Sequence, residues 1–486
     1  METEFSHSGI KGLDVILKGN LTPGLSVLVA GYAGTGKTIF TMQWLNNCYR
    51  SPGQECLYIS LNETADDLRN NIKSFKWAQD KLQILDLSPK GIPTRAGEYS
   101  VFSPSEVELP GIWEAIYEAI ETRKPSCVVI DSVTFLGYLS ADNFQFRKQL
   151  LNLLNYLKRL KCTSMLIYEP EEMMQDDTLS LSVDCIVMLS RNVSPSRVTD
   201  IRTIEIQKLR GKDYFSGIHH FRITDEGIII YPHIIEDSEN ITPADEKIES
   251  GISGLDKLLG GGIEKGTTTL ITGPAGIGKS TFATHMCYNA AINGYKSVYY
   301  SFEESSGYII KRLKGLGIPL EKYINDGTIK ILHINPLQMF PDELLGNLRQ
   351  EILNGVTCVV LDSMRGYEIA MEQYGNMRSH IQNMSNFLKS IHITTLFINE
   401  IEYITGNVRL TDFGISFMVD NAILLRFAEI NGKLVRLVSC VKKRLSGFEP
   451  EVREFQFNPG MGITVGEKLE GFSGILSGTL EKIIPG

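Results

Sequence analysis

Long hydrophobic runs are missing from this sequence of 486 residues. No run reaches roughly 18 apolar residues, the length that a membrane-spanning helix needs. Residues 1–8 are polar and acidic, unlike a secretory signal peptide. An excess of positive charge is also missing, because the net charge is −9, and this disfavours a general nucleic-acid-binding surface. We therefore expect a cytoplasmic protein that acts neither at a membrane nor broadly on nucleic acid.

Cysteine motifs are absent as well. The eight cysteines show no C-x-x-C spacing, and Cys127 and Cys358 lie within apolar runs where buried thiols are expected. We predict a reducing compartment with neither a disulfide framework nor a zinc site. The isolated pair His219-His220 is not expected to bind a metal.

What the sequence does contain, twice, is the pattern G-x-x-x-x-G-K-[ST], at 31–38 and 273–280. Its glycines let backbone N–H groups converge on phosphates, its Lys adds a positive charge, and its hydroxyl ligates Mg²⁺. A plain Gly-rich turn is the alternative, but each loop follows a short apolar strand and precedes a helical stretch. We predict ATP binding by Gly34, Thr35, Gly36, Lys37, Thr38, Gly276, Ile277, Gly278, Lys279 and Ser280.

The two loops belong to two similar halves. The motif Gly-Ile-x-Gly-Leu-Asp begins at Gly9 and again at Gly251, 242 positions later, and Gly36 and Gly278 are separated by the same interval. The polar stretch 236–240 fits an exposed linker. We predict a first domain at 1–232, a linker at 233–247 and a second domain at 248–486.

Each half alternates short apolar runs with amphipathic helical stretches, which predicts an α/β fold. Such a fold has a mostly parallel sheet with helices on both faces, and its ligands bind beyond the carboxyl ends of the strands. The expected strands are 26–30, 56–60, 127–130, 269–272, 297–302 and 358–361, and the expected helices include 113–122 and 146–160.

Two carboxylates end apolar strands downstream of the loops. Asp131 and Asp362 both follow such a run and precede Ser. An Asp in this place can hold Mg²⁺ opposite the loop hydroxyl. We therefore predict metal sites made by Thr38 with Asp131 and by Ser280 with Asp362.

A second group of carboxylates follows the next strand. Glu303 and Glu304 align with Asn62 and Glu63, and a carboxylate there could orient the attacking water. A solvated strand end is the alternative. Because neighbouring strand residues point to opposite faces, only one glutamate of the pair should address the water, and the sequence does not say which.

A cationic cluster recurs after the sheet in each half. Lys208 and Arg210 match Lys442 and Arg444, and the Lys-x-Arg spacing places both cations on one face of a strand. Either these are exposed strand ends, or they reach the γ-phosphate of a neighbouring subunit.

Taken together, these motifs resemble the RecA-type ATPases, and most closely the KaiC family of cyanobacterial clock ATPases. The resemblance extends from Gly9 to about Gly478. It implies two tandem RecA-like P-loop domains with ATP and Mg²⁺ as cofactors. It also implies a homo-oligomeric, hexameric double ring with ATP between subunits, the cationic clusters reaching across, and the adjacent glutamates as catalytic carboxylates.

Several positions depart from that family. KaiC phosphorylates a Ser-Thr pair, but here Ser416 is followed by Phe417, so only a single phosphoserine at Ser416 is conceivable. Asn62 replaces a glutamate, so the first ring would turn ATP over slowly if that position does the chemistry. Leu445 replaces a glycine after the second cationic cluster. The chain ends at Gly486, so the family's long C-terminal tail, which partner proteins grip, is expected to be largely absent.

We therefore expect a KaiC-like ATPase with a regulatory role other than the clock, an unknown regulatory protein partner, and at most weak serine autophosphorylation. Two alternatives remain. One is a DNA-acting recombinase or helicase-like relative, which the acidic charge and the lack of a DNA-binding module before Gly9 disfavour. The other is a nucleotide-dependent scaffold with little turnover, which Asn62 makes plausible for the first ring.

Overall fold

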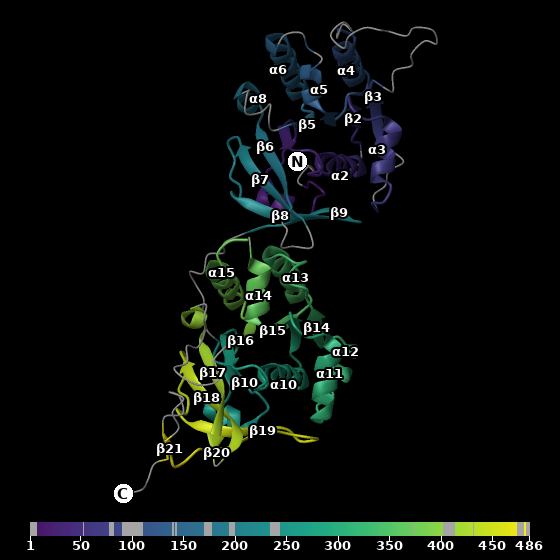
Figure 1. Ribbon diagram of the computed structural model, residues 1–486. Helices are drawn as coiled ribbons and strands as arrows, with labels where there is room; N and C mark the ends of the chain where they lie inside the picture. The colour runs from purple at the N-terminus through teal and green to yellow at the C-terminus, as the bar shows by residue number, and fades with distance from the viewer. Residues whose placement is uncertain are drawn as a thin grey trace. The chain divides into compact units, whose positions relative to one another are not determined.

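The computed structural model divides into two compact units, Met1–Ile234 and Ile235–Gly486. We call them the first and the second domain and describe each by itself (Figure 1). The structure describes residues 7–51, 53–76, 82–89, 110–138, 140, 143–169, 177–193, 200–233, 244–372, 374–401, 414–430, 432–473 and 481–482. Residues 236–240 of the expected linker lie outside these ranges.

A nine-stranded sheet forms the middle of the first domain, in the order β3-β2-β4-β5-β1-β6-β7-β8-β9. Strands β3 to β6 of this order pair in parallel, and β7, β8 and β9 extend the sheet by antiparallel pairing. The strands are β1 (Ser26–Gly31), β2 (Cys56–Ser60), β3 (Gln83–Asp86), β4 (Cys127–Asp131), β5 (Thr163–Tyr168), β6 (Cys185–Asn192), β7 (Ile201–Leu209), β8 (Ile218–Thr224) and β9 (Gly227–Tyr231).

Helices cover both faces of this sheet, because alternate residues of each buried strand point to opposite sides. Val27 and Val29 of β1 pack in one core with α2, whereas Leu28 packs in a second core with α4, α5 and α6. Figure 1 shows α2 apart from the group α4–α6. The helices are α1 (Leu13–Ile16), α2 (Lys37–Arg50), α3 (Ala65–Ile72), α4 (Pro110–Arg123), α5 (Val133–Tyr138), α6 (Asn143–Arg159) and α8 (Asp177–Ser182).

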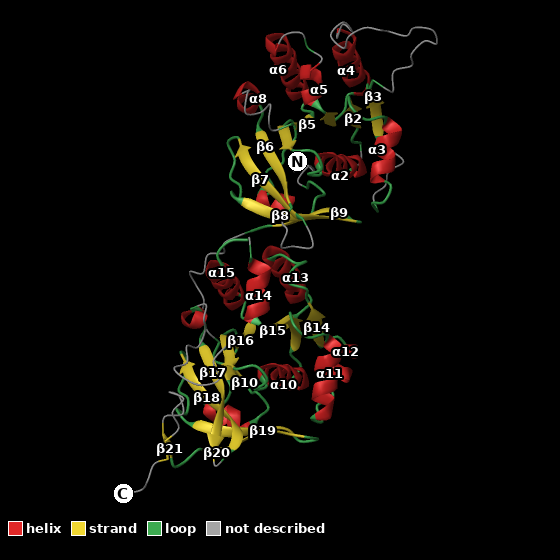
Figure 2. Cartoon of the chain, in the orientation of Figure 1, coloured by secondary structure: helices red, strands yellow, loops and turns green. Residues whose placement is uncertain are grey.

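The second domain repeats this architecture with the sheet order β14-β13-β15-β16-β12-β17-β18-β19-β20 (Figure 2). Helices α10 and α11 pack on one face, and α13, α14 and α15 on the other. Its strands are β10 (Lys247–Ile248), β11 (Ile263–Glu264), β12 (Thr268–Gly273), β13 (Lys296–Ser301), β14 (Ile329–His333), β15 (Val356–Asp362), β16 (Thr394–Glu400), β17 (Asn421–Ile430), β18 (Lys433–Lys443), β19 (Val452–Asn458), β20 (Gly462–Lys468), β21 (Phe472–Ser473) and β22 (Glu481–Lys482). Its helices are α9 (Ser253–Leu258), α10 (Lys279–Ile292), α11 (Ser306–Gly315), α12 (Glu321–Asn325), α13 (Pro341–Leu353), α14 (Met364–Met371), α15 (Met377–Ser390) and the 3₁₀ turn η1 (Ile415–Phe417).

The sequence-based fold class is confirmed, and the expected strands and helices are present within a few residues of their predicted ends. The antiparallel extension was not predicted, because β7 to β9 and β18 to β20 carry mixed, half-exposed patterns instead of continuous apolar runs. Within the described ranges, no helix is long and apolar enough to cross a membrane.

Candidate nucleotide sites

Each glycine-rich loop joins a buried central strand to the helix packed on it, β1 to α2 and β12 to α10. The residues that precede these helices, Gly36 and Gly278, have φ values of 104° and 113°. Residues other than glycine rarely adopt such backbone angles. The free N–H groups of the first helical turn therefore face the carboxyl end of the sheet, where an anion is favoured.

The loop lysines are already held in place by their own domains. Lys37 Nζ donates to the carbonyl of Gly31 at 2.5 Å and pairs with Glu169 at 2.9 Å. Lys279 Nζ donates to Pro274 O at 2.9 Å and lies 3.5 Å from Glu400. Burial lowers the pKa of Lys279, against the opposing effect of Glu400. Both ammonium groups are thus placed beside the loops and have carboxylate partners.

The predicted magnesium ligands lie together in both domains. Thr38 Oγ1 donates to Asp131 Oδ2 at 3.2 Å, and Ser280 bonds Asp362 in the same way. Burial raises the pKa of Asp131 and of Asp362, against the hydrogen bonds that these carboxylates accept. A hydroxyl and a carboxylate at this separation can occupy neighbouring positions around one Mg²⁺.

The first glutamate of the second domain and its counterpart in the first domain make the same contact with different chemistry. Glu303 Oε1 accepts from the hydroxyl of Ser363, the residue after Asp362. Asn62 Nδ2 donates to the hydroxyl of Ser132, the residue after Asp131, at 3.1 Å. A carboxylate that could accept a proton is therefore replaced by an amide that cannot.

The second glutamate of each pair is turned toward the following helix. Glu304 accepts from Arg312 Nη1 at 2.7 and 2.6 Å, and Glu63 accepts from Asn71 Nδ2 at 2.9 Å. Burial, followed by the charge of Asp131, raises the pKa of Glu63. We expected the alternation of side chains along a strand to separate Glu303 from Glu304. That explanation does not apply, because β13 ends at Ser301 and both glutamates lie in the loop beyond it.

Each loop opens into a cavity, of about 400 Å³ in the first domain and about 420 Å³ in the second. Both volumes fall within the range of small-molecule sites. Arg202 and Ile223 from the antiparallel strands line the first cavity, and Arg436 and Phe457 line the second. Arg202 Nη1 also donates to the loop carbonyl of Gly34 at 2.8 Å.

The cationic clusters lie at the opposite edge of each sheet. Arg210 is level with Ser26, the first residue of β1, because its N–H bonds Asp184 O and the N–H of Asp184 bonds Ser26 O. At about 3.3 Å per residue, that is roughly 16 Å along the strand from the end of β1, where the loop begins. Lys208 Nζ donates to Ser180 O and Arg210 Nη2 to Leu181 O.

The second cluster repeats this placement and also contacts the candidate phosphosite. Lys442 Nζ donates to Ser416 O and Val419 O, both at 2.7 Å, and Arg444 Nη2 donates to Phe417 O at 2.5 Å. Ser416 itself is half-buried. Both clusters are therefore distant from the nucleotide loop of their own domain.

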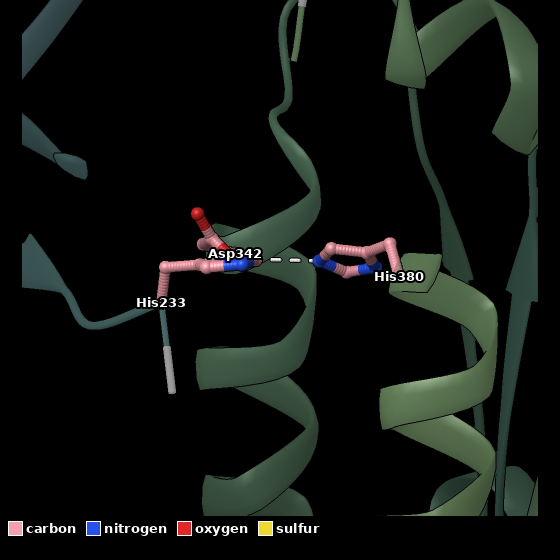
Figure 3. Close-up of side chains that lie close together, drawn as sticks. All are labelled: His233, Asp342 and His380. Carbon is pink, nitrogen blue, oxygen red and sulfur yellow. Dashed lines mark hydrogen bonds and ion pairs between the residues drawn. The ribbon is translucent and has the colours of Figure 1, made fainter. Parts of the chain in front are cut away.

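The cysteines are buried in the protein interior, and His219 of the histidine pair is hydrogen-bonded to the backbone. All eight cysteines are buried free thiols, and burial was predicted for Cys127 and Cys358. His219 Nε2 contacts Phe215 O, and its Nδ1 accepts from the N–H of His233. In the second domain, His380 Nε2 faces Asp342 Oδ1 at 3.4 Å, between the starts of α15 and α13 (Figure 3). This buried pair does not line the nucleotide cavity.

Comparison with known proteins shows the family to which the chain belongs. The family model for the KaiC ATPase matches residues 6–234 and 248–470. The chain belongs to the KaiC ATPase family. Among curated relatives, the circadian clock oscillator protein KaiC of Parathermosynechococcus lividus is 29% identical, over 98% of this chain and 88% of the relative. KaiC of Synechococcus elongatus is 28% identical, over 98% and 91%. The circadian clock protein KaiC3 of a Synechocystis species is 28% identical, over 97% and 94%.

This KaiC-family ATPase contains cavity residues that the sequence did not reveal. Glu400 lines the second cavity, and Glu169 pairs with the loop residue Lys37 of the first domain. Both follow apolar strands as Asp131 and Asp362 do, and that pattern could have identified them. Arg312 lies eight residues beyond Glu304 on α11, where an amphipathic helix gives no sign that one cation turns back toward the loop. Arg202 and Arg436 come from antiparallel strands whose pairing was not predicted.

Proposed function

We propose that this ATPase is a nucleotide-driven ring in which the second domain carries most of the hydrolysis and the first domain holds ATP with slow turnover. One observation supports this division most strongly. The carboxylate of Glu303 accepts a hydrogen bond from the hydroxyl of Ser363, whereas the amide of Asn62 donates one to the hydroxyl of Ser132. An amide cannot act as a general base for the attacking water.

Both domains fit the nucleotide and its metal. The loop N–H groups with Lys37 and Lys279 would bind the phosphates, and Thr38 with Asp131, like Ser280 with Asp362, would hold Mg²⁺. The bound ion would neutralise charge on the outer phosphates. The buried carboxylates with raised pKa support this role, since a divalent cation compensates the burial of their negative charge.

Within the second domain, the contacts favour Glu303 over Glu304 as the residue that orients water. Glu303 is hydrogen-bonded to Ser363, the residue after the proposed metal ligand Asp362. Both carboxylate oxygens of Glu304, in contrast, accept hydrogen bonds from Arg312. Glu303 accepts the proton of the attacking water in this assignment. Glu63 of the first domain stays turned toward Asn71.

The cationic clusters support assembly into a ring. Lys208 with Arg210, and Lys442 with Arg444, lie at the sheet edge opposite their own loops, so in this proposal they act on the nucleotide of another subunit and not on their own. A hexamer with ATP at each interface is the assembly that the family resemblance implies. Cations that reach across in this way stabilise the charge of phosphoryl transfer.

The regulatory part of the proposal is a switch that responds to nucleotide state in the cytoplasm and acts on a partner protein not yet identified. The relatives are named for the circadian clock. Ser416 is the candidate phosphosite in the second domain. Because Ser416 lies beside Lys442, at the edge opposite its own loop, a phosphate on it would come from a neighbouring subunit.

The test measures ATP turnover and native mass together, with and without nucleotide. We expect a ring that assembles with ATP, and Lys37→Ala should weaken that assembly because it removes a phosphate contact at the interface. Full rings of Lys37→Ala protein without nucleotide in the first domain would refute nucleotide-dependent assembly.

A further inference from the structure

One cation in the second nucleotide cavity has no counterpart in the first. Arg312 of α11 occupies the position of Asn71 on α3, and each lies eight residues after the glutamate it contacts. Both positions line their cavities. The two cavities therefore differ by a positive charge at the same place.

This extra cation accompanies an extra carboxylate. Glu303, Glu304, Asp362 and Glu400 all line the second cavity, whereas Asn62 stands in place of Glu303 in the first domain. A triphosphate entering the second cavity meets two neighbouring glutamates beside its own negative charge. Such like charges oppose binding unless one of them has a counter-ion.

Arg312 supplies that counter-ion to one glutamate only. Its Nη1 bonds both oxygens of Glu304, whereas Glu303 bonds the neutral hydroxyl of Ser363. The side chains of Arg312 and Glu304 are 31% and 40% exposed, so the pair is only partly screened by solvent. The Nε and Nη2 atoms of Arg312 are shielded from solvent and have no hydrogen-bond acceptor among the described residues. The guanidinium is thus directed to Glu304 alone.

We propose that Arg312 is a positioning residue of the second domain, which holds Glu304 at the side of the cavity so that Glu303 alone faces the water and the triphosphate meets one fewer unpaired charge. This inference rests on the proposed function, since it assigns work to Glu303. It is a device of the second domain, because Asn71 in the first domain carries no charge.

The test is a double-mutant cycle on steady-state ATP turnover by the full chain. Arg312→Asn introduces the residue found in the first domain and leaves Glu304 without its counter-ion. We expect the KM for ATP to rise about tenfold, the equivalent of one moderately screened charge. In the Glu304→Gln background the same change should raise KM less than about twofold.

Two further variants keep the result interpretable. Arg312→Lys retains the charge and should recover most of the lost affinity. Lys314→Asn is the matched control, because it removes a cation from the same helix whose side chain is 73% exposed and pairs with Glu321 outside the cavity. Its KM should stay that of the unmodified chain.

An equal rise in KM in both backgrounds would overturn the proposal, because Arg312 would then act on the nucleotide directly. An unchanged KM in Arg312→Asn would overturn it as well. If Arg312→Asn does not fold, Arg312→Gln takes its place in both backgrounds, so that the cycle still has a neutral single variant and measures the coupling. Glu303→Gln is assayed in parallel. Unchanged turnover there refutes the proposed function, while the Arg312–Glu304 coupling is still read from KM.

Discussion

The two domains share a sheet order, a loop, a buried lysine and a buried aspartate, yet their cavities differ where the attacking water would lie. The first domain has Asn62 and Asn71, and the second has Glu303 and Arg312. The groups that we propose to bind phosphate and metal are thus repeated, while the groups that we propose to act on water are not. Duplication of a nucleotide site therefore need not duplicate its rate of hydrolysis.

The largest effect is expected when the second domain loses the carboxylate that the first domain lacks. Glu303→Gln keeps the shape of the side chain and loses the base, so turnover should fall by about 10²–10⁴-fold while ATP remains bound. Phosphate release and bound nucleotide are measured on the same sample. Glu304→Gln is the control and should lose less. A larger loss from Glu304→Gln would exchange the roles of the two residues.

The converse change adds a carboxylate to the first domain. Asn62→Glu should bring a carboxylate to the hydroxyl of Ser132, as Glu303 accepts a hydrogen bond from the hydroxyl of Ser363. In the Glu303→Gln background, where the first domain supplies the remaining activity, turnover should rise at least about tenfold. Asn71→Asp adds a negative charge near Glu63 instead and serves as the control. No gain from Asn62→Glu would show that the slow rate has another cause.

The loop glycines provide a comparison of stability. An added Cβ on Gly278 would lie 2.2 Å from the ring of Phe457, whereas on Gly36 it would meet the tip of Ile223 at 3.0 Å. Gly278→Ala should therefore cost about 3 kcal/mol and Gly36→Ala about 1–2 kcal/mol, measured by denaturant unfolding without nucleotide.

Gly276→Ala is the control for this pair. Gly276 also has a positive φ, of 71°, but a Cβ there meets nothing within 4 Å. It should show the backbone cost alone, about 1–2 kcal/mol. Equal losses at Gly278 and Gly276 would contradict the role of Phe457 in packing against the loop.

The smallest expected effect concerns Ser416. Incubation with Mg-ATP followed by peptide mass spectrometry should find phosphoserine on Ser416, at low occupancy. The Ser416→Ala change should remove this phosphate and alter ATP turnover less than about twofold. Ser446, near the cationic cluster of the same domain, is the control position. Phosphate on Ser446 instead of Ser416 would contradict the assignment.

The sequence was sufficient to locate the features that local spacing defines. Both loops, the strand-ending Asp131 and Asp362, and the helices after the loops follow from local spacing, and the structure places them together. It was insufficient where strands distant in the chain must pair. Arg202 and Arg436 reach the cavities only because β7 and β18 run antiparallel beside the parallel strands.

Side-chain direction was the second limit. The spacing of Glu303 and Glu304 showed that the two differ but did not show which partner each would take. Their partners decide that: Ser363 follows β15 and precedes α14, and Arg312 lies on α11. A cation eight residues downstream on an amphipathic helix is expected to face solvent unless its partner is already known.

The most direct test of unequal domains is a rapid-quench measurement of ATP hydrolysis by protein loaded with labelled ATP, with nucleotide counted per chain. The account predicts two phases of equal amplitude, roughly one nucleotide each, because each chain has two phosphate loops. The fast phase should disappear in Glu303→Gln. A single phase that consumes both nucleotides at one rate, or a fast phase that survives Glu303→Gln, would contradict the account.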